Sequence, residues 1–164
     1  MILEPAKRLI KTDKSGVSFE MCPCSTEDFS ALLEMYSIFS PKPASQGLPP
    51  KNPEVCYNWV KQLLDIGINF LAWRNDRVIG HAAIVPDPNG KSGEFIIFVD
   101  QNCRNLGVGT EMTRLTLQKA RQLAFDSLWL TVENSNLIAI KLYRNFGFQF
   151  RDEDISERIM LLKL

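Results

Sequence analysis

The sequence of 164 residues has no excess of charge, because 19 lysines and arginines balance 19 aspartates and glutamates. A chain without a net positive charge has no overall field that would draw it to nucleic acid or to an anionic membrane. The sequence also contains no apolar run of membrane-spanning length and no apolar secretory segment near its N-terminus. We therefore expect a cytoplasmic protein with no nucleic-acid partner and no membrane partner.

Metal-binding patterns are missing as well. The four cysteines include no CxxC pair, and the single histidine, His81, has no partner at zinc-ligand spacing. Cys22 and Cys24 flank one proline and are too close for an easy disulfide, so the cysteines are expected to be structural thiols. His81 lies in an apolar strand pattern, where a lone histidine is more often structural than a catalytic base. We expect no metal.

Hydrophobic periodicity predicts one folded unit over residues 17–164, preceded by an N-terminal leader over 1–16. Strands are expected at 17–23, 68–74, 78–86, 94–99, 127–132 and 158–164. Helices are expected at 26–38, at 53–65 after a proline that suits a first turn, at 107–124 and at 136–146. The helix 107–124 connects two strands as a crossover, which implies a parallel pair. The pattern predicts an α+β domain with a mixed sheet.

Two glycines one residue apart, in CRNLGVGTEM (103–112), follow the strand 94–99. The first N–H groups of a helix lack partners and attract anions, and glycine lets a phosphate approach them closely. Arg104 adds a positive charge. By itself, GxG is more often a simple turn. A Walker loop is excluded because GK[ST] is absent, and a dinucleotide fingerprint would need a third glycine where Met112 stands.

The longer pattern V99-D-x-x-x-R104-x-x-G107-x-G109 resembles the acyl-CoA-binding motif of the GNAT superfamily of N-acetyltransferases, [Q/R]-x-x-G-x-[G/A]. Residues 130–148 resemble that family's second motif, N-x-x-A-x-x-L-Y-x-x-x-G-F, beginning at Asn136. The resemblance covers about 17–164, so this range is expected to be a GNAT acyl-CoA-binding acetyltransferase domain. It implies the GNAT fold: a mixed, mostly antiparallel sheet with a splayed parallel central pair and helices on both faces.

The resemblance also assigns roles to particular residues. Glu94 matches a general base, and Tyr143 matches a residue that donates a proton to the sulfur of CoA. A solvated charge at a strand start and a packed aromatic side chain are the ordinary alternatives for these two. The implied cofactor contacts are Phe98, Val99, Arg104, Asn105, Leu106, Gly107, Val108, Gly109, Thr110, Asn136, Ala139 and Tyr143. An N–H near Val99 would polarise the thioester carbonyl.

The resemblance implies an N-acetyltransferase that moves an acetyl group from acetyl-CoA to a primary amine and releases CoA. PDPNGKSGEFIIFVD and RIMLLKL are similar to the acetyltransferase domain of bacterial protein-lysine acetyltransferases, so the acceptor is either a small-molecule amine or a protein lysine. It is expected to bind near 36–57 and 149–157, where acidic residues cluster at 152–157. We expect a monomer or homodimer. A non-catalytic acyl-CoA sensor and a nucleotide-binding or DNA-associated protein are the alternatives.

Overall fold

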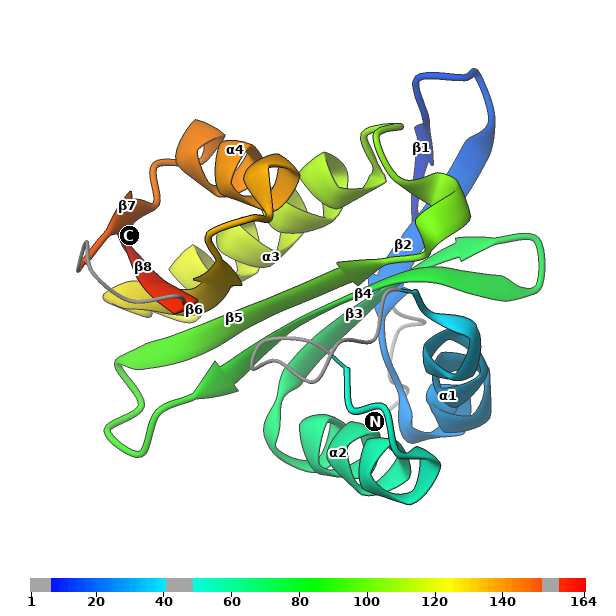
Figure 1. Ribbon diagram of the computed structural model, residues 1–164, viewed down its shortest axis with the longest axis horizontal. Coiled ribbons are helices and arrows are strands. Elements are labelled where there is room, and N and C mark those ends of the chain that lie inside the picture. Colours follow the sequence, from blue (N-terminus) through cyan, green and yellow to red (C-terminus); the bar gives the residue numbers. More distant parts are fainter. Residues whose placement is uncertain (1–6, 41–48, 152–156) are drawn as a thin grey trace.

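The computed structural model describes residues 7–40, 49–151 and 157–164. The strands are β1 (Leu9–Thr12), β2 (Ser18–Pro23), β3 (Ile68–Arg74), β4 (Arg77–Pro86), β5 (Ser92–Val99), β6 (Ser127–Glu133), β7 (Gln149–Phe150) and β8 (Glu157–Lys163). The helices are α1 (Phe29–Ile38), α2 (Pro53–Ile66), α3 (Val108–Gln122) and α4 (Leu137–Asn145), with short 3₁₀ turns η1 (Thr26–Asp28) and η2 (Gln101–Cys103). All the strands join one sheet in the order β1-β2-β3-β4-β5-β6-β8-β7 (Figure 1).

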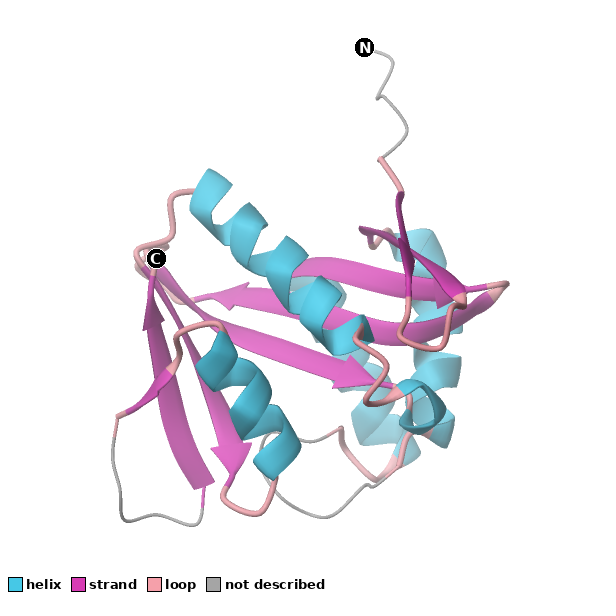
Figure 2. Cartoon of the chain, turned by 90° about the horizontal axis from the view of Figure 1, so that it is seen from above, coloured by secondary structure: helices cyan, strands magenta, loops and turns pink. Residues whose placement is uncertain are grey.

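One parallel pair, β5 and β6, divides this otherwise antiparallel sheet, and α3 connects its two strands. Their pairing covers only Ser92–Glu94 on β5 and Ser127–Trp129 on β6. Each strand stays paired with its other neighbour to its end, β5 with β4 and β6 with β8. The two strands therefore part beyond Glu94 and diverge in Figure 2. The expected mixed sheet with a splayed parallel pair is confirmed.

Helices cover both faces of the sheet, as expected (Figure 1). On one face, α3 and α4 enclose a cluster that includes Phe95, Met112 and Phe148. On the other face, α1 and α2 enclose a second cluster around Tyr36 and Phe98. Successive side chains of a strand point to opposite faces, so β5 contributes to both clusters. No helix among the described residues combines the length and apolar character needed to cross a bilayer.

The N-terminal segment joins the sheet earlier than the sequence pattern indicates. Residues 9–12, which lie in the expected leader, form β1 and pair with β2 from Leu9↔Met21 to Thr12↔Ser18. The strand is short and almost wholly exposed, so it lacks the alternation that would reveal it. The leader thus belongs to the sheet from Leu9 onward, and residues 1–6 lie outside the described part.

His81 is a buried structural residue, as expected for a lone strand histidine. Its Nδ1 lies 2.7 Å from the Tyr36 hydroxyl, and its Nε2 lies 2.8 Å from Oδ1 of Asn69. The Asn69 amide donates to the Leu63 carbonyl, so its oxygen accepts from Nε2–H and the Tyr36 hydroxyl donates to Nδ1. Burial lowers the pKa of His81 to about 3, so the ring is neutral in the folded protein.

This lowered pKa predicts how stability depends on pH. The unfolded chain protonates His81 below about pH 6.5, whereas the folded chain holds it neutral to about pH 3. Stability from this residue is therefore complete above pH 6.5 and decreases as the pH falls, by about 1.4 kcal/mol per unit. Between pH 7 and pH 5, denaturant unfolding should show wild type losing about 2 kcal/mol more than His81→Gln. Equal losses in the two proteins would contradict a neutral, buried His81.

Candidate active site

The open edge of β5 is the first component of the site. The Asp100 N–H donates to the Ile79 carbonyl on β4, 2.8 Å away. Peptide groups alternate between the two edges of a strand, and the β4–β5 register is regular. The N–H groups of Val99 and Ile97 therefore face the space between β5 and β6, the Phe95 N–H lies on the same edge where the ladder to Trp129 ends, and the peptide groups of Phe98 face β4. Of the two expected contacts on this strand, Val99 presents backbone at the opening and Phe98 contributes a buried side chain.

The loop that follows β5 turns its backbone toward the start of α3. Asn105 and Gly107 adopt left-handed φ values of 61° and 92°. Because α3 begins at Val108, immediately after Gly107, the predicted helix start is confirmed. The N–H groups of the first helical turn have no partner within the helix before Glu111, whose N–H donates to Gly107. The loop and the first turn thus form a concentration of backbone donors at the positive end of a helix, which suits a phosphate.

Arg104 lies between the open strand and α1. Its Nε donates to the Val99 carbonyl at 3.1 Å, and its guanidinium stacks 5.0 Å from the centre of the Phe39 ring. Burial lowers the pKa of Arg104, and the guanidinium remains a cation. Gln101 strengthens the same junction, since its side chain donates to the Ile38 carbonyl and accepts from the Ser40 N–H. The C-terminal end of α1 is therefore fastened to the candidate phosphate loop.

The second motif brings α4 to the other side of the opening. Asn136 caps α4, because its Oδ1 accepts from the Ala139 N–H at 3.1 Å. The side-chain NH2 group of Asn136 is exposed and can still donate hydrogen bonds. Tyr143 is buried against Phe95 and Phe148, with ring centres 6.2 Å and 5.9 Å away. Burial raises the pKa of the Tyr143 phenol, so it stays protonated. Among the described residues its hydroxyl has no hydrogen-bond partner.

Glu94 lies where β5 and β6 part. It is half-buried and aligned with Trp129 on β6, on the face that carries α1 and α2. Burial raises the pKa of Glu94, and the negative charge of Asp87 raises it further. Asp87 is held in place by the Trp129 indole N–H at 3.1 Å and by the Ser92 hydroxyl at 2.5 Å. A carboxylate with a raised pKa is a better proton acceptor, which suits Glu94 to general-base chemistry.

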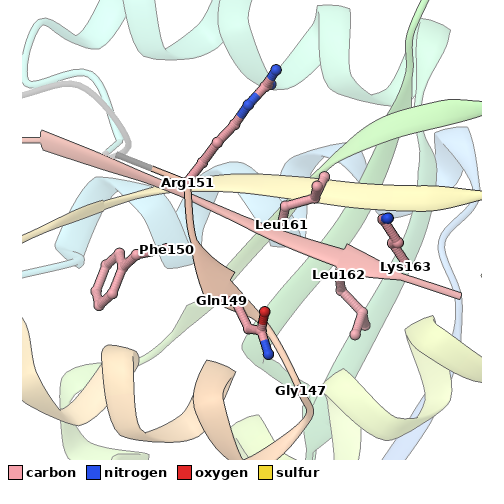
Figure 3. Close-up of a pocket in the computed structure, with 7 residues that line it drawn as sticks. All are labelled: Gly147, Gln149, Phe150, Arg151, Leu161, Leu162 and Lys163. Atoms are coloured by element: carbon pink, nitrogen blue, oxygen red, sulfur yellow. The ribbon is translucent and has the colours of Figure 1, made fainter. Parts of the chain in front are cut away.

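Sequence reasoning found the motif residues but missed their supports. No sequence motif marks Gln101, Phe39 or the contact between Asp87 and Trp129. Each of them matters through a contact with a residue that is distant in sequence and that only the fold brings near. A hollow of about 430 Å³ beside β7 and β8 includes none of the expected catalytic or cofactor-binding residues, although Gln149, Phe150 and Arg151, which line it, belong to the expected acceptor segment 149–157 (Figure 3). In the described ranges, no group of three or more histidine, cysteine or acidic side chains is placed to hold a metal ion, and none of the four cysteines forms a disulfide.

The profile of the acetyltransferase (GNAT) family matches residues 32–148, which is most of the chain. The chain belongs to the GNAT acetyltransferase family. Among curated relatives, the mycothiol acetyltransferase of Geodermatophilus obscurus is 32% identical over 95 residues, which are 54% of this chain and 31% of the relative. The spermine/spermidine N(1)-acetyltransferase of Bacillus subtilis is 31% identical over 84 residues, which are 48% of this chain and 55% of the relative. The chain therefore spans about a third to a half of the length of these relatives.

Solved structures of GNAT proteins share the fold. The GNAT domain of S. lividans PAT superposes with a TM-score of 0.80 at 13% identity, covering 96% of this chain and 97% of that domain. The PaiA N-acetyltransferase of Thermoplasma acidophilum, solved in complex with coenzyme A, superposes with a TM-score of 0.70 at 18% identity and covers 90% and 100% of the two chains. Because the sequence identities are this low, the structural similarity shows that the chain has the GNAT fold and nothing further.

Replacing Gly107 or Gly109 by alanine should have different effects on stability and on CoA affinity. Gly107→Ala places a side chain in a left-handed conformation, which costs about 1–2 kcal/mol and strains the loop that carries the phosphate donors. At Gly109 an added Cβ would lie 3.6 Å from Leu142 and Val99, an ordinary contact, inside a helix. We expect Gly107→Ala to lower both thermal stability and CoA affinity and Gly109→Ala to preserve both. Calorimetric titration with CoA and thermal unfolding measure the difference, and equal effects would contradict the assigned loop geometry.

Proposed function

We propose that this chain is an acetyl-CoA-dependent N-acetyltransferase that acetylates a primary amine. The observation that carries the proposal is the unpaired edge of β5, which leads directly into a loop of backbone N–H donors at the start of α3. An extended ligand arm can pair with a free strand edge, and a diphosphate suits the N-terminus of a helix. Acetyl-CoA has both parts in the matching order: its extended pantetheine arm would lie along the strand edge, and its diphosphate would lie at the start of the helix. Membership of the GNAT acetyltransferase family also supports acetyl-CoA as the acyl donor.

In the proposed site for acetyl-CoA, the pantetheine arm lies along the open edge of β5 and pairs with the free N–H group of Val99. The diphosphate rests on the loop from Arg104 to Thr110, and the amide of Asn136 and the helix surface at Ala139 line the opposite wall. Because the diphosphate lies beyond Val99, the thioester comes at the other end of the arm, toward Glu94, where the Ile97 N–H on the open edge stabilises the negative charge that develops on its oxygen. The expected cofactor contacts other than Phe98, including Asn105, Leu106 and Val108, are thus interpreted as one continuous site for acetyl-CoA.

The reaction balances as a direct transfer. The amine nitrogen attacks the thioester carbon, a C–N bond forms, and the C–S bond then breaks. Glu94, whose pKa is raised by burial and by Asp87, accepts the proton that the cationic amine must lose before it attacks, and the second N–H proton, lost as the amide forms, passes to solvent. Tyr143, whose pKa is raised by burial, supplies a proton to the departing sulfur of CoA. Tyr143 therefore begins the reaction protonated, as an acid must be, whereas Glu94 acts as a base in its ionised form.

The proposed acceptor is an amine that is a cation in solution. Glu94, Asp87 and the Trp129 ring meet where β5 and β6 part, and carboxylates beside an aromatic face attract a cationic amine. A relative named for spermine and spermidine supports a small-molecule amine, whereas the case for protein lysine rests on likeness of fold. The expected acceptor segments 36–57 and 149–157 include 41–48 and 152–156, which lie outside the described residues.

Two conservative substitutions test the proposed chemistry. Glu94→Gln removes the base and Tyr143→Phe removes the acid, and neither changes the shape of the site greatly. General acid–base groups contribute about 10²–10⁴-fold to rate, so turnover should fall by this order while calorimetric affinity for acetyl-CoA stays within about twofold. Release of free thiol in a screen of polyamines, amino acids, peptides and protein lysines measures turnover. A wild-type chain that binds acetyl-CoA without any turnover would instead be a sensor.

The charge of Asp87 predicts a shift in the pH profile. Asp87→Asn removes the repulsion that raises the pKa of Glu94 and keeps an oxygen to accept from Trp129 and Ser92. The base then ionises at lower pH, so the acidic limb of the kcat/KM profile should move to lower pH in the variant. The rate on the plateau should change little. An unchanged acidic limb would show that another group, or the acceptor amine itself, controls that ionisation.

A further inference from the structure

The turn between β1 and β2 is joined to the candidate phosphate loop by contacts from both. The Lys14 N–H donates to the Leu106 carbonyl at 2.9 Å, which links the turn to the residue before Gly107. Arg74 bridges the same two segments: it pairs with Asp13 at 2.5 Å and donates to the Cys103 sulfur at 3.8 Å. The N-terminal hairpin is therefore a fixed wall of this loop, and the two lie at the same end of the sheet (Figure 1).

The turn itself is ordered by a buried carboxylate. Oδ1 of Asp13 accepts from the Ser15 hydroxyl at 2.6 Å and from the N–H groups of Ser15 and Val17 at 2.8 Å and 3.1 Å. These bonds, the one from Ser15 hydroxyl foremost, lower the pKa of Asp13 to about 2. With its oxygens occupied by Ser15, Val17 and Arg74, Asp13 does not neutralise its neighbour Lys14. The turn thus presents Lys14 from a defined backbone.

The side chain of Lys14 runs along Gly107. A Cβ built on Gly107 would lie 3.8 Å from both Cγ and Cε of Lys14, so the ammonium group, one bond beyond Cε, lies beside the loop backbone. Lys14 is exposed, and no carboxylate in the described ranges forms an ion pair with it. Lys11, by contrast, is paired with Glu111 at 3.2 Å in the first turn of α3. A cation from outside the glycine motif therefore lies over the middle of the loop.

We propose that Lys14 is a binding residue for the diphosphate of the acyl-CoA donor, so that the β1–β2 turn completes the phosphate loop. This inference rests on the proposed function, because that function supplies the diphosphate. Backbone N–H groups carry only partial charges, and a lysine beside them adds a full positive charge and a charge-assisted hydrogen bond. Leu106 and Gly107 lie next to Lys14, which favours the diphosphate over a phosphate farther from the loop.

The test measures affinity for CoA and for 3′-dephospho-CoA by calorimetry in wild type, Lys14→Gln, Lys14→Arg and Lys7→Gln. Lys7→Gln is the matched control, because it removes the same charge beyond the opposite end of β1 from the turn. We expect Lys14→Gln to bind both ligands about three- to tenfold more weakly than wild type. This difference in affinity should become smaller as salt is added, because salt screens the charge of Lys14. Lys14→Arg should retain affinity, and Lys7→Gln should stay close to wild type.

The two ligands separate the diphosphate from the 3′-phosphate. A loss confined to CoA would place Lys14 at the 3′-phosphate and overturn the proposal. Unchanged affinity in Lys14→Gln, or an equal loss in Lys7→Gln, would also overturn it. Failure of the wild-type chain to bind CoA is a different result, because it would contradict the proposed function itself. Lys14 is exposed, so its substitutions test binding in a folded protein.

Discussion

The proposed site for acetyl-CoA depends on the short pairing between β5 and β6. The strands are joined at their beginning, where the Asp126 N–H donates to the Lys91 carbonyl at 2.7 Å and the ladder continues to Glu94 and Trp129. Beyond that point each strand is held by its outer neighbour alone, so the peptide groups along the inner edge of β5 lack a partner strand. Unpaired backbone donors in a packed protein need a partner, and an extended ligand satisfies them.

The loop at the wide end of this opening is held from two directions. Arg104 and Gln101 fasten it to the end of α1, and the Lys14 backbone and Arg74 fasten it to the β1–β2 turn. Both connections join segments distant in sequence, and both hold the loop backbone in one conformation without a ligand. Such preorganisation reduces the cost of ordering the loop on binding. The glycines permit the backbone conformation, and these contacts maintain it.

Local signals explain which features were predictable from sequence. The start of α2 at a proline, the start of α3 after Gly107 and the parallel pair joined by α3 all follow from neighbouring residues, and the structure confirms them. The β1 strand, the Asp13–Arg74 pair across 61 residues and the Asp87–Trp129 contact across 42 residues were not predictable. They depend on tertiary packing, and none leaves a periodic pattern in the chain.

Amide hydrogen exchange with and without CoA tests most directly whether the opening between β5 and β6 is the donor site. If it is, CoA should slow exchange at the N–H groups of Ile97 and Val99 and at 104–110, because both sets gain a hydrogen-bonding partner or lose access to water. The hollow beside β7 and β8 should show no change. Protection at β7 and β8 without protection at Ile97, Val99 and 104–110 would contradict the account.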